Sequence, residues 1–483
     1  MAHAASTEPA YLAFDLGASS CRAILGRMIE GRMEMEDVHR FETPVIEDDG
    51  RLYWEIDVLW RELERGAHLA RERAPFVRSL SVDSWGVDYV PLDEAGIPVR
   101  RPYAYRDPRV TGMLARAETR VPRARIYAET GIQFMEINTL YQVLADLEYE
   151  PDLVRQVRNR LTIADYFNYR FSGRPVEEIS LASTTQLLNA RTHQWSSVLL
   201  EAFGLEATAW PELVKPGTRL GLAQGLPGVE VVAGCSHDTA CAVAAAPASD
   251  GGGAWAYLSC GTWSLLGVEL NEPLLDDRAL ASGFTNEAGL DGTVRFLKNM
   301  TGLWLLQECE RVWRARGDRF TYAQLLAEAD AARPPDALVD VDDPRFAPRG
   351  DMPERLAAYC SERGFRPPAT RGEAIRLVLE SMAAGHRRTL RYLEETIGRP
   401  IDTLHMVGGG SQNDLLCQLT ADACGCRLVA GPSEATALGN LLIQARTMGD
   451  LAPDESIRDV VRRSVQLRAY VGRQGAAPGE GGL

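Results

Sequence analysis

The sequence predicts an α/β fold with two domains of similar plan. Apolar strand-like runs alternate with helical segments along the chain, an order that is typical of α/β proteins. A hairpin whose turn is made of small residues occurs near the start of each half, at 15–20 and at 259–262. The 483 residues are enough for two or three domains with sizeable cores.

The first hairpin consists of the apolar run 11–14, the turn 15–20 and a second strand-like run at 21–26. Turns of this composition expose backbone N–H groups and hydroxyls, which can bind phosphate oxygens. Taken by itself, the pattern favours a plain tight hairpin.

A helix and a strand are predicted next. Apolar residues recur at helical spacing over 54–74, and the run 79–83 reads as a strand. A polar and aromatic turn follows at 84–90, where Gly86 marks a place at which another group approaches the backbone closely. Aromatic and polar clusters over 101–190 sit among short helices; most are expected to pack in the core, and a minority could line a sugar pocket.

A polar cluster follows the apolar run 231–234, before an alanine-rich helix predicted at 240–246. In open α/β sheets, ligands bind beyond the carboxyl ends of the strands, so Asp238 is a candidate catalytic carboxylate. The alternative is a helix cap, because Asp or Ser before an alanine run is a normal start signal. This stretch alone favours the cap.

The second half repeats the hairpin and ends in a low-complexity tail. The turn at 250–253 marks a domain boundary, the region 334–368 is expected to be dominated by loops, and a strand–glycine–helix joint at 404–413 brings N–H groups close to a ligand. The other predicted elements are strands at 255–258, 263–268 and 427–430, helices at 373–396 and from Gly439, and a disordered tail at 472–483.

Composition excludes several classes of function. The net charge of −15 argues against nucleic acid as a partner. The two lysines, Lys215 and Lys298, are not followed by Ser or Thr, so a Walker-type P-loop is excluded. The nine cysteines are an odd number and are spread thinly, and neither a secretory signal nor a run of about 18 apolar residues is visible. We therefore expect reduced thiols, a cytoplasmic location and no membrane partner.

Other catalytic readings find no support in the motifs. A metal hydrolase built on His237 and Asp238 lacks an H-E-x-x-H or similar ligand cluster. A serine hydrolase lacks the second glycine of G-x-S-x-G around Ser236. The glycine-rich turn at 408–413 is not a dinucleotide fingerprint, because its third glycine position holds Asn413.

Taken together, the motifs resemble those of the FGGY family of carbohydrate kinases. The resemblance covers the chain from Asp15 to about Gly449 and departs from the family pattern at Cys21 and Cys260, which stand where glycine and serine are expected; Ala18 replaces a threonine of many relatives. The motifs that carry it lie at 15–22, 83–88, 105–107, 130–134, 138–142, 165–167, 183–187, 236–239, 259–264, 297–299, 302–307, 407–413 and 431–440.

The resemblance implies an actin-like ATPase (ribonuclease H-like) fold, in which two α/β domains flank a central cleft. It implies a sugar-binding N-terminal domain at 1–247, an ATP-binding C-terminal domain at 248–460, and a tail at 461–483 that is disordered at its end. The cofactors would be ATP and Mg²⁺.

The resemblance also assigns roles to individual residues. Asp238 would be the general base, and Gly86, His237 and Thr239 would bind the sugar. Asp15 would reach Mg²⁺ through water. The ATP contacts would come from Ala18, Ser19, Ser20, Cys21, Arg22, Thr262, Asn299, Gln307 and Gly409.

The implied reaction is ATP-dependent phosphorylation of L-rhamnulose at its 1-hydroxyl. Another ketose, such as L-fuculose or D-xylulose, is the alternative substrate, because one pocket contact changes preference only modestly. A non-catalytic sugar sensor that binds ATP is the alternative from another class.

Overall fold

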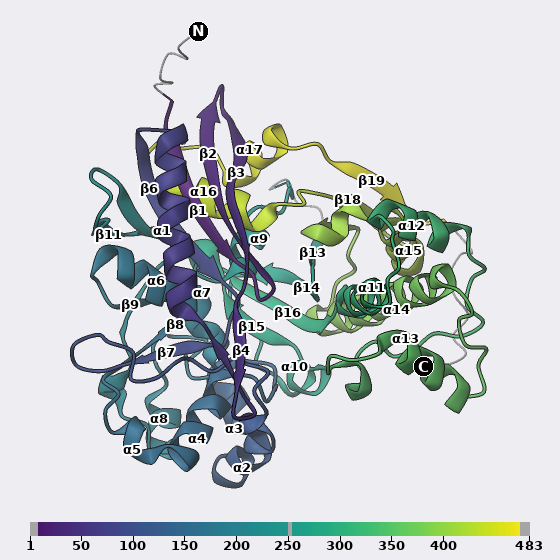
Figure 1. Cartoon of the computed structure of the whole chain (residues 1–483), viewed down its shortest axis with the longest axis horizontal. Coiled ribbons are helices and arrows are strands. Elements are labelled where there is room, and N and C mark those ends of the chain that lie inside the picture. The colour runs from purple at the N-terminus through teal and green to yellow at the C-terminus, as the bar shows by residue number, and fades with distance from the viewer. Residues whose placement is uncertain (1–7, 250–253, 474–483) are drawn as a thin grey trace. The chain divides into compact units, whose positions relative to one another are not determined.

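The computed structural model describes residues 8–249 and 254–473 (Figure 1). The turn predicted at 250–253 and the end of the predicted tail lie outside these residues. The chain forms two compact units, each described by itself below: unit 1 comprises Met1–Ala245, Glu269–Phe296 and Ala435–Ser464, and unit 2 comprises Ala246–Val268, Leu297–Glu434 and Val465–Leu483.

A six-stranded sheet with the order β11-β12-β6-β1-β2-β3 forms the centre of unit 1. Strand β1 pairs antiparallel with β2 and parallel with β6, and β6 pairs parallel with β12, so the carboxyl ends of β1, β6 and β12 lie at one edge. The strands are β1 (Ala10–Leu16), β2 (Ser20–Ile29), β3 (Arg32–Glu42), β6 (Val77–Ser84), β11 (Thr218–Leu222) and β12 (Glu230–Ala233).

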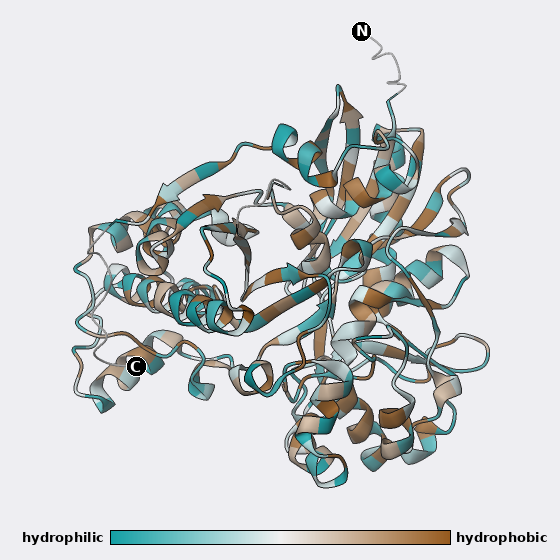
Figure 2. Ribbon diagram, turned by 180° about the vertical axis from the view of Figure 1, so that it is seen from behind, coloured by the Kyte–Doolittle hydropathy of each residue, from teal (hydrophilic) through white to brown (hydrophobic). Residues whose placement is uncertain are grey.

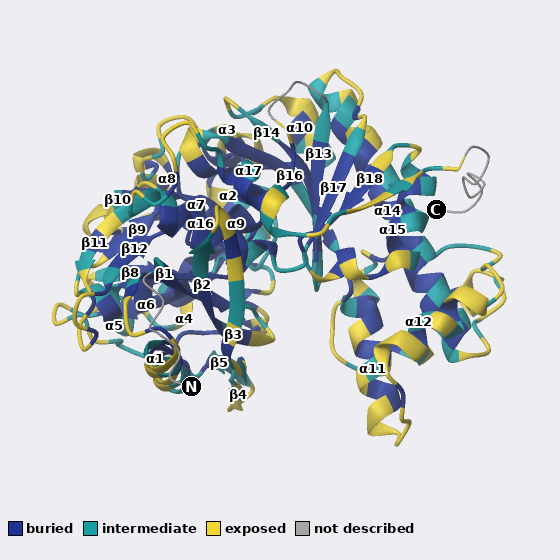
Figure 3. Ribbon diagram, turned by 90° about the horizontal axis from the view of Figure 1, so that it is seen from above, coloured by how far each residue is buried: buried dark blue, intermediate teal, exposed yellow. Residues whose placement is uncertain are grey.

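Helices cover both faces of this sheet. On one face, Trp60 of α1 (Ile56–Arg73) packs on Phe167 and Phe171 of α6 (Ile163–Ser172). On the other face, α9 (Asp238–Ala244) packs against α16 (Ala435–Thr447). Every residue of β1 is buried, in keeping with a strand covered on both sides (Figure 3).

Gly439 lies inside α16, which begins four residues earlier than predicted. A Cβ at this position would come within 2.0 Å of the Cys241 carbonyl oxygen, so the glycine permits the close approach of α9 and α16. This packing also explains why 435–464 group with unit 1, whereas the sequence predicts a division into 1–247 and 248–460. Part of the predicted tail forms a strand, β19 (Arg468–Val471).

The remaining elements of unit 1 are short. The strands are β4 (Val45–Asp48), β5 (Arg51–Trp54), β7 (Tyr89–Leu92), β8 (Asn159–Thr162), β9 (Val176–Glu178), β10 (Glu212–Val214) and β15 (Thr285–Ala288). The helices are α2 (Met113–Arg120), α3 (Arg123–Thr130), α4 (Thr139–Tyr149), α5 (Pro151–Val154), α7 (Ile179–Ala182), α8 (Ser197–Phe203), α10 (Asp277–Ser282) and α17 (Ile457–Ser464).

Unit 2 is built on a sheet with the strand order β16-β14-β13-β17-β18-β19. The second predicted hairpin is confirmed, since β13 and β14 pair antiparallel. The other strands are those predicted around 404–407 and 427–430, together with two more. Their bounds are β13 (Trp255–Cys260), β14 (Trp263–Leu270), β16 (Val294–Thr301), β17 (Thr403–Val407) and β18 (Arg427–Ala430).

In unit 2, α12 (Tyr322–Ala331) and α15 (Asp414–Cys424) pack against α14 (Arg371–Ile397). Figure 2 shows that hydrophobic and hydrophilic residues alternate along the helices and strands of the chain. His386 of α14 lies within hydrogen-bond distance of Ser264 on β14 and Thr420 on α15. The region 334–368 is not all loop, because Met352–Glu362 forms α13, capped by Asp351. Helix α11 (Trp304–Ala315) also belongs to this unit.

No helix within 8–249 or 254–473 is long and apolar enough to span a membrane. All nine cysteines are free thiols, as the sequence predicts, and most of them are buried.

Candidate active site

Three carboxylates gather at the carboxyl edge of the sheet in unit 1. Asp15 on β1 and Asp83 on β6 are register partners, and Asp238 follows β12 at the start of α9. A bridge between Ser84 and His237 brings the segment after β12 alongside the end of β6. The parallel strands therefore place Asp15, Asp83, His237 and Asp238 at one edge, where ligands of α/β proteins bind.

Asp238 is held by its own helix. The N-cap of α9 is His237, which makes no capping bond through its side chain, and Asp238 Oδ1 accepts the backbone N–H of Thr239. The same oxygen accepts the Thr239 hydroxyl at 3.0 Å and lies 3.4 Å from His237 Nε2. Asp238 thus binds the first turn as a capping residue does, and its side chain is still 30% exposed.

The environment of Asp238 suits a proton acceptor. Burial raises the pKa of this carboxyl, the charge of Asp15 raises it further, and His237 opposes both effects. A base with a raised pKa binds the proton of a substrate hydroxyl more strongly than an ordinary aspartate does. Asp238 Oδ2 makes no hydrogen bond within the described chain, so it is open to such a proton.

Asp83 is a residue of this edge to which the sequence analysis gave no role of its own. It is completely buried; its Oδ2 accepts the side-chain amide of Asn440 at 2.6 Å, and its Oδ1 has no hydrogen-bond partner among the residues described. Burial and the neighbouring Asp15 charge hold the pKa of Asp83 well above its usual range. Its place in the strand–turn motif at 83–88, directly before the polar turn, was the signal that could have found it.

The first hairpin turn presents backbone to solvent. Ser19 and Ser20 are exposed, whereas the Cys21 thiol points inward, 3.2 Å from the Thr43 hydroxyl. A ligand at this turn would therefore meet the backbone of Cys21 and not its thiol. Arg22 forms an ion pair with Asp15 at 2.5 Å, and no group of three or more His, Cys, Asp or Glu side chains in the described residues could hold a metal ion by itself.

Thr184 packs closely against the turn at Gly86. A Cβ at Gly86 would lie 3.0 Å from the Thr184 hydroxyl, so the close approach predicted here is made by Thr184 in this structure. Val87 has φ +73°, a conformation that β-branched residues rarely adopt. Its N–H donates to Thr184, and its carbonyl accepts from Thr139 and Gln142. Strained backbone that is fixed by several partners is typical of ligand-binding sites.

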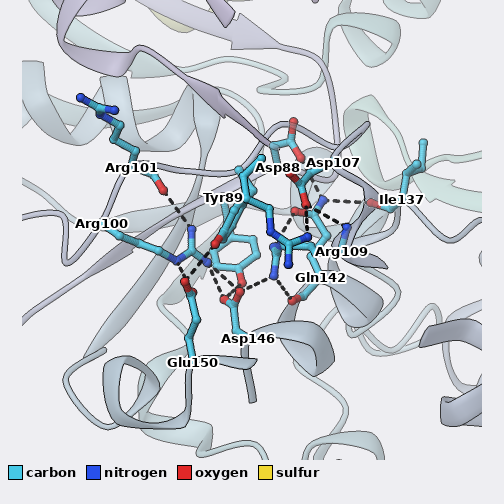
Figure 4. Close-up of polar contacts among 12 residues, drawn as sticks. Asp88, Tyr89, Arg100, Arg101, Asp107, Arg109, Ile137, Gln142, Asp146 and Glu150 are labelled. Carbon is cyan, nitrogen blue, oxygen red and sulfur yellow. Dashed lines mark hydrogen bonds and ion pairs between the residues drawn. The ribbon is translucent and has the colours of Figure 1, made fainter. Parts of the chain in front are cut away.

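A buried polar network supports this turn (Figure 4). Gln142 of α4 donates to Asp88 Oδ1 at 2.8 Å and also to the carbonyls of Val87 and Ile137. The indole N–H groups of Trp54 and Trp85 donate to the other oxygen of Asp88. Burial raises the pKa of Asp88 to about 6, although these hydrogen bonds favour the ionised form.

Arginines continue the network behind Gln142. Arg109 donates to the Gln142 carbonyl at 2.9 Å and pairs with Asp146, which also accepts from Arg100 at 2.7 Å and from the Tyr89 hydroxyl. Burial opposes ionisation of Asp146, but the two guanidinium groups hold its pKa below the usual range. Fixed charges of this kind keep α4 and β7, and with them the turn at 86–88, in one arrangement (Figure 4).

The second hairpin in unit 2 contacts the start of α11. The Thr262 hydroxyl donates to Gln307 Oε1 at 3.2 Å, and the N–H of Gly302 donates to the Thr262 carbonyl. Asn299 lies on β16, shortly before this contact. A Cβ at Gly302 would come within 2.5 Å of the Gly261 carbonyl oxygen, so α11 can approach the hairpin only with glycine there.

Among the three glycines of the turn after β17 (408–410), one has free space beside its backbone. Gly408 has φ +81°, and a Cβ at Gly410 would come within 2.4 Å of Cys260 Sγ. A Cβ at Gly409, by contrast, would meet no atom within 4 Å. The predicted site residues thus form two groups: Asp15, Ala18–Arg22, Gly86 and 237–239 in unit 1, and Thr262, Asn299, Gln307 and Gly409 in unit 2.

Comparison with known proteins identifies the family. The N-terminal domain model of the FGGY family of carbohydrate kinases matches residues 10–244, and its C-terminal domain model matches residues 256–448. The chain belongs to the FGGY family of carbohydrate kinases. Kinases of this family use ATP, so the family prediction and the prediction of ATP as a cofactor are confirmed.

Two relatives match this kinase over nearly its full length. A rhamnulokinase of Bacteroides thetaiotaomicron is 42% identical, and the match covers 95% of each chain. A rhamnulokinase of Klebsiella pneumoniae is 41% identical over 95% of this chain and 94% of its own. Among solved structures, a xylulose kinase from Rhodospirillum rubrum matches with a TM-score of 0.77 at 18% identity, covering 97% of this chain and 95% of that chain. The structural match confirms the predicted actin-like ATPase fold.

Proposed function

We propose that this kinase transfers the γ-phosphoryl group of ATP to the 1-hydroxyl of L-rhamnulose, giving ADP and L-rhamnulose 1-phosphate. The identity of the sugar is supported by the relatives at 41–42% identity, which are rhamnulokinases. The reaction type is supported by Asp238, whose Oδ1 is occupied by Thr239 while Oδ2 is open.

In the proposed mechanism, Asp238 Oδ2 accepts the proton of the 1-hydroxyl as the sugar oxygen attacks the γ-phosphorus. The new bond joins this oxygen to phosphorus, the bond to the bridging oxygen of ADP breaks, and ADP leaves. His237 and Thr239 hold neighbouring sugar hydroxyls, and the backbone at Gly86 meets the sugar. Positioning and charge stabilisation supply most of the acceleration in such transfers.

The nucleotide would be held mainly by 248–460, through Thr262, Asn299, Gln307 and Gly409. The open space over Gly409 supports a close approach of the ligand to the backbone there. The hairpin residues Ala18, Ser19, Ser20, Cys21 and Arg22 of the sugar-binding part, 1–247, would contact the phosphates through N–H groups, hydroxyls and the guanidinium.

The oxygen donors at the strand edge fit Mg²⁺, which keeps several waters and needs only one or two carboxylates besides phosphate. Asp15, with Asp83 beside it, would hold the ion through water. When bound, Mg²⁺ would neutralise charge on the phosphate oxygens.

An assay of ADP release across ketoses tests the proposed function. Purified protein with MgATP is offered L-rhamnulose, L-fuculose and D-xylulose, and NMR identifies the phosphorylated carbon. We expect the highest kcat/KM with L-rhamnulose and phosphate on O1. A higher value with another ketose would contradict the substrate assignment, and ATP binding without ADP release for any ketose would identify a sugar sensor.

A further inference from the structure

A buried ion pair next to His237 takes no part in the proposed mechanism. Arg295 of β16 is fully buried and pairs with Glu287 of β15, with 3.0 Å between Arg295 Nη1 and Glu287 Oε2. Both residues belong to unit 1, as does His237. A completely buried arginine is costly to desolvate, so its contacts call for an explanation.

Arg295 makes a hydrogen bond to the ring of His237. Its Nη2 lies 3.0 Å from His237 Nδ1, and its Nε donates to the Ala288 carbonyl at 3.1 Å. Glu287 Oε2 is also near Nδ1, at 3.4 Å, but makes no hydrogen bond with any described residue. Arg295 is therefore the group that bonds Nδ1, and Glu287 balances its charge.

The chemistry of the guanidinium decides the direction of this bond. Arginine carries five N–H donors and no acceptor, so Nδ1 must accept. In a neutral imidazole, the nitrogen that accepts has no proton, and the other nitrogen carries it. For His237 that other nitrogen is Nε2, which faces Asp238 Oδ1 at 3.4 Å.

We propose that Arg295 is a positioning residue that fixes His237 in the tautomer with its proton on Nε2, so that the imidazole donates toward Asp238 and the sugar. This inference rests on the proposed function, because it assigns Arg295 to the orientation of the same base.

With the proton of His237 on Nε2, the two oxygens of Asp238 bind different groups. Oδ1 already accepts both donors of Thr239, and an Nε2–H of His237 adds a third donor on the same side. The lone pairs of Oδ2 then remain for the proton of the sugar hydroxyl. With the opposite tautomer, a bare Nε2 would face the carboxylate and repel it.

The tautomer can be measured without any turnover. Full-length protein labelled with ¹⁵N-histidine is studied by long-range ¹H–¹⁵N NMR at pH 7.5, and His237 is assigned from the signals that are missing in folded His237→Gln. We expect a protonated Nε2 and an unprotonated Nδ1. A proton on Nδ1, in either the neutral or the charged ring, would overturn the proposal.

Variants at Arg295 connect the tautomer to catalysis. Arg295→Lys keeps a cation that can only donate. We therefore expect this variant to retain the tautomer and most of the wild-type kcat. Arg295→Met combined with Glu287→Met removes both buried charges together, and we expect a mixture of tautomers and a loss of roughly 10- to 100-fold in kcat, with KM for ATP unchanged. Arg446→Met, which breaks an exposed pair with Asp291, is the matched control.

The outcomes separate this inference from the proposed function. A wild-type tautomer and kcat in the folded double variant would overturn the role of Arg295. If the double variant does not fold, the wild-type tautomer and the rescue by Arg295→Lys decide the question. Absence of ADP release from the wild-type protein would contradict the proposed function, whereas the NMR result would still test the hydrogen bond from Arg295.

Discussion

The N–H of Val87 donates to the Thr184 hydroxyl at 3.2 Å, and this bond holds a β-branched residue at φ +73°. A backbone of this kind costs on the order of 1–3 kcal/mol and persists only where its surroundings fix it. Thr184 also fills the space beside Gly86, so this one side chain contacts both Gly86 and Val87 in the turn that we assign to the sugar.

Thr184→Val removes the hydroxyl while keeping the shape of the side chain. Without this acceptor the turn loses one of the groups that fix it, so we expect KM for the ketose to rise about tenfold and stability to fall by about 1 kcal/mol. KM for ATP should not change. Steady-state kinetics and urea unfolding measure both effects.

Thr185→Val is the matched control, because the Thr185 hydroxyl bonds to the Ala182 carbonyl and does not contact the turn. A comparable rise of KM in both variants, or no rise in Thr184→Val, would contradict the role given to the turn.

Gly409→Ala and Gly410→Ala should behave oppositely. A methyl group at position 409 meets no protein atom, so we expect normal stability and weaker ATP binding, with KM for ATP raised at least severalfold. At position 410 the methyl group would collide with Cys260, and overpacking of this kind typically costs about 1–3 kcal/mol. Thermal unfolding together with ATP titration distinguishes the two, and unchanged ATP affinity in Gly409→Ala would argue against a ligand at this position.

Asp165 should make stability fall as the pH rises. Its Oδ1 accepts the Ser236 hydroxyl at 2.7 Å and its Oδ2 accepts the Glu178 N–H at 2.8 Å, yet burial raises the pKa of Asp165 to about 6. A group whose pKa is higher in the folded state stabilises the protein below its unfolded pKa, about 3.9, and this contribution is lost as the pH rises through about 6.

Asp165→Asn removes the titrating group. The amide oxygen can still accept the Glu178 N–H, and the amide nitrogen can donate to the Ser236 hydroxyl oxygen, which reverses that hydrogen bond. We expect the free energy of unfolding of the variant, relative to wild type, to improve by about 1 kcal/mol from pH 5 to pH 7.5. The exposed Glu201→Gln should show no such trend. Urea unfolding at both pH values is the measurement, and a relative stability that stays constant or moves the other way would be the contrary result.

Local pattern predicted most elements of the fold. The two hairpins, α1 and α14 follow from apolar periodicity and small-residue turns, and the structure confirms them. Pattern did not predict α13, because its segment is rich in Pro, Asp and Arg. It also placed the start of α16 at Gly439, whereas this glycine lies inside the helix and permits the close contact with α9.

The sequence predicted those site residues whose role follows from their immediate neighbours in the chain. Asp238 stands out because it follows a buried strand directly. Arg295 and Thr184 act on His237 and on the turn at 86–88 from 58 and 97 residues away, so only the folded chain brings them together. The motif at 83–88 marks the position of Asp83 in the sequence, but its pairing with Asp15 on the neighbouring strand is seen only in the folded chain.

The central claim is that Asp238 accepts the proton of the sugar hydroxyl. The most direct test compares ADP release from L-rhamnulose and MgATP by wild type and Asp238→Asn, with calorimetry to confirm that both ligands still bind. We expect normal binding and a loss of kcat on the order of 10²- to 10⁴-fold, because an amide cannot take up the proton. A kcat close to that of wild type in the folded Asp238→Asn variant would contradict the assignment.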